Sequence, residues 1–149
     1  PEKTQEVIKD GWLHTGDIGR IDEDGDLFIL GLKKRMIIVK GQNIWPMDIE
    51  KVLHHHPQIA EAVVVGVADE LRGETVGAAV RLKDGETTTE EDIKRFCRQY
   101  LINYKIPKRI LFMNSLPKTA DGQIRRETVS ELLKLQIASS PPESQVKAI

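Results

Sequence analysis

Residues 60–82 read AEAVVVGVADELRGETVGAAVRL and contain two valine-rich apolar runs, at 60–67 and at 75–82. Short runs of β-branched residues that are bounded by turn signals are typical of strands. The triplet Lys83-Asp84-Gly85 predicts a turn directly after the second run. The centre of the chain therefore predicts two successive strands.

Upstream of this centre, the pattern predicts another strand and a helix. Residues 36–40 (MIIVK) form a short β-branched run, and the segment GQNIWP that follows interrupts it. Pro46 suits the first turn of a helix, and Pro57 ends that helix. The apolar positions of the helix fall at i, i+3, i+4 and i+7, namely Ile49, Val52, Leu53 and His56.

Downstream, the pattern predicts a helix, a strand and a final helix. Thr89 is a natural N-cap, Pro107 closes the loop after the helix, and residues 109–113 (RILFM) predict a strand. Residues 119–122 (TADG) predict a turn. The apolar positions are Ile93, Phe96, Cys97, Tyr100 and Leu101 on the first helix, and Val129, Leu132 and Leu133 on the second.

Residues 18–31 (IGRIDEDGDLFILG) predict a β-hairpin that turns at an Asp-Gly pair. A calcium-binding loop that starts at Asp22 is the alternative. It is excluded because Leu27 and Lys33 occupy the sixth and twelfth positions, where such a loop needs Gly and Glu.

The order of elements is therefore a hairpin followed by β-α-β-β-α-β-α, with no strict βαβ alternation and no internal repeat. This order favours an α+β fold of two layers, with helices packed on a small mixed or antiparallel sheet, over a doubly wound sheet. The basic run at 31–35 (GLKKR) separates the opening hairpin from the rest and predicts a boundary.

Composition narrows the class of protein further. The 149 residues carry a net charge of −1, which disfavours a dedicated nucleic-acid binder, and no apolar run reaches the roughly 18 residues of a membrane span. A single cysteine, Cys97, excludes an internal disulfide framework and suits a reducing compartment. The opening residues carry no targeting pattern, and the closing ASSPPESQVKAI predicts a frayed tail. We therefore expect a soluble, cytoplasmic protein.

Three histidines and one cysteine are expected to have structural roles. Adjacent residues on a helix point about 100° apart, so His54, His55 and His56 cannot share one metal ion well, and we expect no metal site here. His56 lies on the apolar face and is expected to pack in the core. Cys97 lies among apolar residues of its helix, where a thiolate is disfavoured, so we expect a buried thiol.

Two exposed segments leave alternatives open. The first segment, 33–40, contains four basic residues, which form either a solvated edge that discourages aggregation or an anion site for phosphates: Lys33, Lys34, Arg35 and Lys40. Residues 116–126 (LPKTADGQIRR) are either an ordinary connection or an exposed loop that places one side chain accurately. The sequence contains neither a Walker loop nor GxGxxG, so the chain has no nucleotide cradle of its own.

Four segments together resemble the C-terminal part of AMP-forming acyl-CoA synthetases, which share a superfamily with aryl-CoA ligases, luciferases and adenylation domains. They are GWLHTGD (11–17), GLKKRMIIVKGQNIWPMDIE (31–50), VVGVADELRGE (64–74) and LPKTADGQIRR (116–126). The resemblance implies an enzyme that joins a carboxylic acid to AMP and then transfers the acyl group to coenzyme A (CoA). The second segment looks most similar to fatty-acid ligases, which implies a fatty acid as substrate.

The resemblance also implies roles for single residues. Asp17 binds the ribose hydroxyls of the nucleotide, for which a carboxylate offers two acceptor oxygens. Lys34 lies at the hinge about which the small domain swivels between the two half-reactions. Lys40, Gly41 and Gln42 form the CoA-binding loop, where glycine leaves a narrow thiol tunnel open.

Two positions depart from the family's pattern. Leu32 stands where the family has an arginine that contacts the nucleotide. Gln123 stands where it has a catalytic lysine that reaches the α-phosphate and the carboxylate. Loss of such a charge costs about 10²–10³ in rate. Three explanations stay open: the parent enzyme adenylates weakly, Gln123 is an engineered change, or another cation substitutes.

The resemblance divides the chain into the end of an N-terminal domain (1–31), a hinge (32–35), a mobile C-terminal domain (36–135) and a flexible tail (136–149). It implies that the missing N-terminal domain is a partner, that this domain holds ATP with Mg²⁺ and the carboxylic acid, and that the chain alone is inactive. An aryl-CoA ligase or an adenylation domain is the alternative among enzymes. A binding module of α+β fold and a small nucleic-acid-binding domain are the alternatives outside them.

Overall fold

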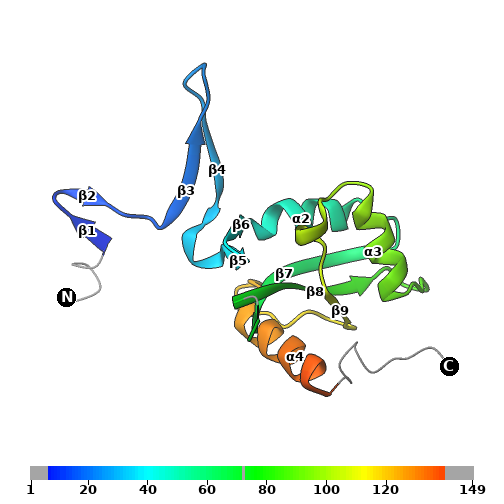
Figure 1. Cartoon of the computed structure of the whole chain (residues 1–149). Coiled ribbons are helices and arrows are strands. Elements are labelled where there is room, and N and C mark those ends of the chain that lie inside the picture. Colours follow the sequence, from blue (N-terminus) through cyan, green and yellow to red (C-terminus); the bar gives the residue numbers. More distant parts are fainter. Residues whose placement is uncertain (1–6, 72, 140–149) are drawn as a thin grey trace.

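The computed structural model describes residues 7–71 and 73–139. Its body contains a five-stranded sheet in the order β6-β5-β8-β7, with β9 also paired to β8 (Figure 1). β7 (Ile59–Asp69) and β8 (Gly73–Leu82) pair antiparallel along their length, and β9 (Arg109–Phe112) runs parallel to β8. The predicted central strands are therefore confirmed, and both begin earlier than the sequence pattern indicates.

β5 (Ile37–Val39) and β6 (Gln42–Ile44) form a hairpin at one end of the sheet. Lys40 and Gly41 make the turn with φ values of 48° and 79°, and a two-residue loop with both φ angles positive is favoured in hairpins. The run at 36–40 ends at Val39, as predicted, but the Lys40-Gly41 turn reverses the chain into a further strand, β6, which the sequence pattern does not predict.

Helices cover both faces of the sheet. α2 (Pro46–His54) and α3 (Glu90–Arg98) lie over one face, and α4 (Arg126–Ser139) lies over the other (Figure 1). The predicted α+β class with a small mixed sheet is confirmed, and α4 adds a third layer to the two predicted. The cause lies in Val63-Val64-Val65, three consecutive buried residues whose side chains alternate between the two cores.

The final helix is longer than the sequence predicts. α4 continues to Ser139, so residues 136–139 are helical and do not belong to the predicted tail. Ile137 packs against the same core as Leu133, one helical turn earlier, which explains the extension. Residues 140–149, the remainder of the predicted tail, lie outside the described residues.

Two predicted core residues, Cys97 and His56, are buried. Burial raises the pKa of the Cys97 thiol to about 11, so the thiol stays neutral. His56 packs edge-on against Phe96 with ring centroids 4.8 Å apart, and its Nδ1 lies 3.2 Å from the backbone N–H of Gln58. This ring is therefore a packed core group.

The burial of His56 predicts a pH dependence of stability. Burial lowers the pKa of His56 from its ordinary value of 6.5, and the opposing effect of Asp92 is smaller. As the pH falls, the unfolded chain therefore binds a proton at this histidine before the folded chain does. The contribution of His56 to the free energy of unfolding is complete above pH 6.5 and is lost as the pH falls below that value. We expect a His56→Gln variant to lose less unfolding free energy on acidification than the wild type. Urea unfolding of both proteins above and below pH 6.5 checks this expectation. Equal losses of unfolding free energy in the wild type and the variant would refute it.

Two hairpins precede the body and extend away from it (Figure 1). β1 (Ile8–Lys9) pairs with β2 (Trp12–Leu13), and β3 (Asp17–Ile21) pairs with β4 (Leu27–Leu32). We call β3–β4 the arm. It confirms the hairpin predicted at 18–31.

The turn of the arm uses its acidic residues for backbone hydrogen bonds. Asp22 Oδ1 accepts from the N–H groups of Asp24 and Asp26, at 3.0 and 2.9 Å. Gly25 has a φ of 87°, which glycine adopts without strain. The acidic cluster therefore closes a turn.

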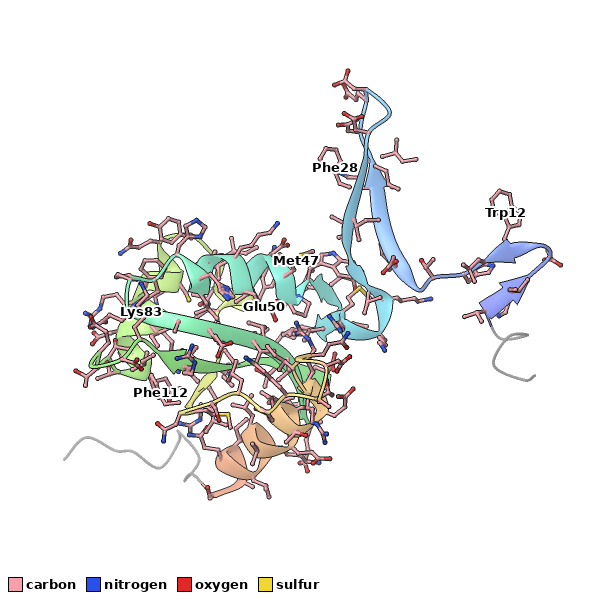
Figure 2. The ribbon with its side chains drawn as sticks, turned by 180° about the vertical axis from the view of Figure 1, so that it is seen from behind. Trp12, Phe28, Met47, Glu50, Lys83 and Phe112 are labelled. Carbon is pink, nitrogen blue, oxygen red and sulfur yellow. The ribbon has the colours of Figure 1, made fainter. Side chains whose placement is uncertain are left out.

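One face of the arm is apolar and open to solvent. Ile21 pairs with Leu27, and Ile29 follows on the same face; their side chains are 68%, 65% and 54% exposed. Figure 2 shows Trp12 and Phe28 also projecting from the two hairpins. Isolated exposed apolar residues are ordinary, but a contiguous face of this kind marks a contact surface.

We expect the chain to self-associate through this apolar face. A triple variant, Ile21→Ser with Leu27→Ser and Ile29→Ser, should sediment as a monomer at concentrations where the wild type sediments as a dimer or larger oligomer. Leu71→Ser is the matched control, because Leu71 is 95% exposed but lies between β7 and β8. Analytical ultracentrifugation makes the comparison, and a monomeric wild type would contradict the expectation.

Candidate functional site

The arm brings together the two predicted nucleotide-binding positions. Asp17 begins β3 and lies directly opposite Leu32, which ends β4. A hydrogen bond of 2.8 Å from the Lys33 N–H to the Gly16 carbonyl fixes this end of the arm. The Asp17 side chain is exposed, and no described residue pairs with its carboxylate. This carboxylate can accept hydrogen bonds from a pair of hydroxyls.

The predicted hinge is a single 3₁₀ turn, η1 (Lys33–Arg35), between the arm and β5. All three side chains are basic and exposed, Lys34 among them. Short 3₁₀ turns often occur as connectors. The rotation about Lys34 stays a prediction.

Gln123 lies on a tight turn between β9 and α4. The Thr119 N–H donates to the Gln123 carbonyl at 2.7 Å, and the Gly122 N–H donates to the Thr119 carbonyl at 3.0 Å. Lys118 and Ile124 form an isolated antiparallel bridge beside this turn. The predicted turn at 119–122 is therefore closed by its own backbone, and it holds Gln123 at the surface.

Both ends of this turn are tied to β7, which lies at the edge of the sheet. Lys118 Nζ lies 2.7 Å from Glu61 Oε1. Arg126 Nη2 lies 2.8 Å from Glu50 Oε1, while its Nη1 donates to the Val64 carbonyl at 2.8 Å. Glu50 Oε1 in turn accepts from the Val64 N–H at 2.9 Å. Side chains thus form hydrogen bonds with the backbone of β7 along an edge that no other strand of the described residues covers.

The turn faces a pocket of about 360 Å³, which we call the glutamine pocket. It lies between η1, the 117–125 loop and the start of α4. Its polar lining includes Lys34, Arg35, Thr119, Gln123, Arg125 and Ser130. The structure therefore brings the predicted hinge residue and the predicted catalytic position into one pocket.

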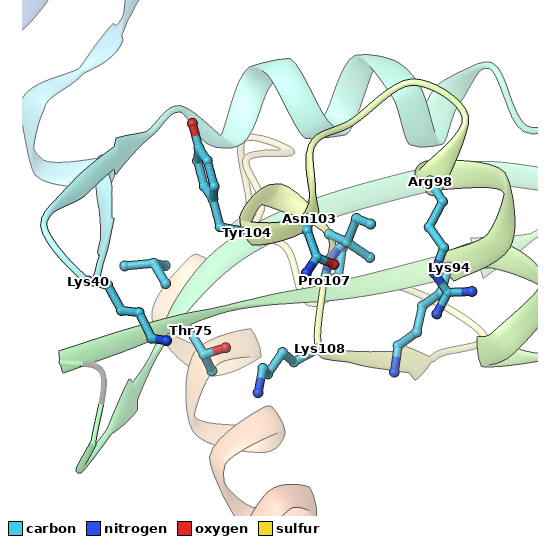
Figure 3. A pocket seen from close by; sticks show the side chains of 10 residues that line it. Lys40, Thr75, Lys94, Arg98, Asn103, Tyr104, Pro107 and Lys108 are labelled. Carbon is cyan, nitrogen blue, oxygen red and sulfur yellow. The ribbon is translucent and has the colours of Figure 1, made fainter.

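A second pocket, of about 500 Å³, lies at the other predicted loop (Figure 3). We call it the four-cation pocket, because it is lined by Lys40, Lys94, Arg98 and Lys108. Lys40 reaches into it from the β5–β6 turn, and Lys94 and Arg98 extend from α3 on the opposite side (Figure 3). No carboxylate is among its described lining residues.

The four cations differ in how far they are already paired. Lys94 Nζ lies 3.0 Å from Glu90 Oε1, and Arg98 Nη1 lies 2.9 Å from Glu91 Oε1. Lys40 and Lys108 are exposed, and neither forms an ion pair with a described residue. Thr75, Asn103 and Tyr104 add further polar groups to the lining. The pocket suits a ligand that carries several phosphate groups.

The predicted residues therefore fall in three places: Asp17 and Leu32 on the arm, Lys34 and Gln123 at the glutamine pocket, and Lys40 at the four-cation pocket. Gly41 and Gln42 adjoin Lys40, but they do not line that pocket. Sequence reasoning missed the contribution of α3, since it used only the apolar face of that helix. The i, i+4 spacing of Lys94 and Arg98 is the signal that could have found it.

The histidine run serves its own helix and the core. The Nδ1 atoms of His54 and His55 lie 3.1 and 2.6 Å from the backbone carbonyls of Glu50 and Lys51. In the described part of the chain, no group of three or more His, Cys, Asp or Glu side chains could hold a metal ion. Within residues 7–71 and 73–139, no helix is both long and apolar enough to cross a membrane.

The fold is that of the C-terminal domain of adenylate-forming enzymes. The family described as the AMP-binding enzyme C-terminal domain matches residues 48–123, and the chain belongs to it. This confirms the resemblance that the sequence motifs indicate.

Several relatives with curated names are CoA ligases. The chain is 47% identical over 140 residues to the mitochondrial medium-chain acyl-CoA ligase ACSF2 of Rattus norvegicus, covering 91% of this chain and 23% of that protein. It is 47% identical over 131 residues to a long-chain-fatty-acid–CoA ligase of Bacillus subtilis, covering 88% and 23%. The chain thus spans about a quarter of the length of these relatives.

Solved structures agree with this assignment. ATP-bound MatB from Rhodopseudomonas palustris superposes with a TM-score of 0.81 at 34% identity, covering 90% of this chain and 27% of that chain. The amide bond synthetase McbA from Marinactinospora thermotolerans superposes with a TM-score of 0.79 at 38% identity, covering 89% and 27%.

Proposed function

We propose that the full-length protein is an ATP-dependent, AMP-forming acyl-CoA synthetase, and that this chain is its C-terminal part. A carboxylate oxygen of the acid attacks the α-phosphorus of ATP, and the bond to pyrophosphate breaks. The CoA thiol then loses its proton, its sulfur attacks the acyl carbon, and the bond from that carbon to AMP breaks. A fatty acid is our proposed substrate, with an aryl acid as the alternative. The relatives include both long-chain-fatty-acid–CoA ligase and 2-succinylbenzoate–CoA ligase.

The observation that carries this proposal is the pair of cationic pockets, which share no lining residue. Each lies beside one of the loops for which the resemblance implies a role. A domain that turns between two half-reactions needs a separate face for each of them. A single binding module needs only one.

We assign the four-cation pocket to the nucleotide end of CoA. That end carries a diphosphate and a 3′-phosphate, and cationic side chains bind phosphates through charge-assisted hydrogen bonds. Lys40 lies on the turn that the resemblance assigns to CoA, and Lys108 is the second unpaired cation among the described lining residues. The pantetheine chain of CoA would then pass the β5–β6 turn, where Gly41 presents no side chain.

We assign the glutamine pocket and the arm to adenylate formation. Asp17 would accept hydrogen bonds from the ribose hydroxyls, with Leu32 opposite it packing against the nucleotide. We place ATP, its Mg²⁺ and the acid in the part of the protein outside this chain. That part is also the proposed partner of the chain and would cover the apolar face of the arm. The proposed domain limits are those predicted, with the C-terminal domain extended through Ser139.

Thioester formation by the full-length protein tests the proposal. It should convert acid, ATP and CoA to acyl-CoA, and a panel of fatty and aromatic acids identifies the substrate class. The 149-residue chain alone should give no product under the same conditions. Turnover by the chain alone, or no product from any acid with the full-length protein, would contradict it.

We keep the cytoplasm as the proposed compartment, because the single cysteine suits a reducing compartment. Cell fractionation checks this proposal.

A further inference from the structure

The glutamine pocket contains cations that can compensate for the missing lysine. Gln123 carries no charge, but four basic residues line the same pocket: Lys34, Arg35, Arg125 and Arg126. Two carboxylates, Glu74 and Glu127, also line the pocket, so the cations outnumber them. Glu74 is already used, because its Oε2 accepts from the Ile38 N–H at 2.8 Å.

These cations differ in their freedom to act on a ligand. Arg126 is occupied, because it pairs with Glu50 and donates to the Val64 carbonyl, and its side chain is only 20% exposed. Lys34 and Arg35 lie on η1, outside the loop that carries Gln123. Arg125 is exposed, and no described residue accepts a hydrogen bond from its guanidinium or pairs with it. Judged from the described residues, Arg125 is the free cation on the same loop as Gln123.

Backbone geometry places Arg125 beside Gln123. Ile124 forms the isolated bridge with Lys118, and its two neighbours in the chain both line the glutamine pocket. The Arg125 N–H donates to the Pro117 carbonyl at 2.8 Å, and the Gln123 N–H donates to Thr119 Oγ1 at 3.2 Å. Residues two apart on an extended chain are separated by about 7 Å, a distance that the long arginine side chain can span.

We propose that Arg125 is a catalytic residue of adenylate formation, which supplies the positive charge that Gln123 lacks. This inference rests on the proposed function. As the acid oxygen bonds to the α-phosphorus and the bond to pyrophosphate breaks, negative charge grows on the phosphoryl oxygens. The guanidinium stabilises that charge with two N–H donors, and the Gln123 amide adds a neutral donor. No proton is transferred in this step.

Separate assays of the two half-reactions of the full-length protein test the role of Arg125. Arg125→Gln should lower acid-dependent pyrophosphate release about 10²–10³-fold. It should leave thioester formation from supplied acyl-adenylate within about threefold, because the other pocket serves that step. Arg125→Lys should keep most of the activity. Gln123→Lys in the Arg125→Gln background should restore pyrophosphate release, because the charge returns on the same face of the loop.

Arg95→Gln is the matched control, because Arg95 is an exposed arginine outside both pockets and should leave both half-reactions unchanged. Full pyrophosphate release by Arg125→Gln, equal losses in both half-reactions, or no rescue by Gln123→Lys would overturn the role of Arg125. A wild type that forms thioester from supplied acyl-adenylate but never releases pyrophosphate would also overturn it. Failure of the wild type in both half-reactions would overturn the proposed function itself.

Discussion

Glu50→Ala should lower the unfolding free energy of this chain by about 3 kcal/mol, which is the lower end for breaking a buried ion pair. The Glu50 carboxylate serves Arg126 and the Val64 N–H at once, at 2.8 and 2.9 Å. Its loss leaves a charge and a backbone donor without their partner, and the side chains of the pair are only 16% and 20% exposed. Some contact of Arg126 with water keeps the expected loss at the lower end.

Urea unfolding of three variants distinguishes this effect from simple loss of charge. Glu50→Gln keeps an acceptor for the Val64 N–H and should lose about half as much stability as Glu50→Ala. Glu91→Ala is the matched control, because it breaks an ion pair whose side chains are 61% and 52% exposed. Exposed pairs of this kind contribute little to stability, because water and salt screen them. Equal losses for Glu50→Ala and Glu91→Ala would show that the β7 edge does not depend on Glu50.

The binding of CoA should depend on the two unpaired lysines of the four-cation pocket. Replacing both unpaired cations of the four-cation pocket, Lys40→Gln with Lys108→Gln, should raise the KM for CoA in the full-length protein about hundredfold. A hydrogen bond to a charged group contributes about 1.5–3 kcal/mol, and each 1.4 kcal/mol is a factor of ten. The KM should also rise with salt, because ionic strength screens contacts between exposed charges.

The assay is thioester formation from supplied acyl-adenylate, with acid-dependent pyrophosphate release as the internal comparison. Pyrophosphate release should be unchanged in the double variant, because the two pockets share no lining residue. Lys134→Gln, an exposed position on α4 outside both pockets, controls for the loss of a lysine. An unchanged KM for CoA would show that the four-cation pocket does not bind CoA.

Most of the fold could be predicted from local pattern. The valine-rich runs predict β7 and β8, and the Thr89 cap is real, since its Oγ1 accepts from the Asp92 N–H at 3.1 Å. The sequence pattern does not predict β6, because a glycine after a short apolar run is typical of a strand end, whereas the Lys40-Gly41 turn adopts the positive φ angles of a hairpin. The third layer was missed because alternate residues of a fully apolar strand give no periodic signal.

The candidate site was predictable only where it is local in sequence. The loops that carry Lys40 and Gln123 were found from their motifs. The partners that anchor them were not, because Glu50 and Arg126 meet only through the edge of β7. The same holds for Lys108, which joins the four-cation pocket through the parallel pairing of β9 with β8. Such contacts between distant segments leave no signal in spacing.

In the proposed mechanism, the full-length protein activates an acid with ATP before CoA takes part. A single-turnover experiment without CoA, using radiolabelled ATP and a fatty acid, tests it most directly. We predict a burst of pyrophosphate and a bound acyl-adenylate in equal amounts, with AMP released only when CoA is added. Formation of ADP and phosphate, or AMP release that does not depend on the acid, would contradict the account.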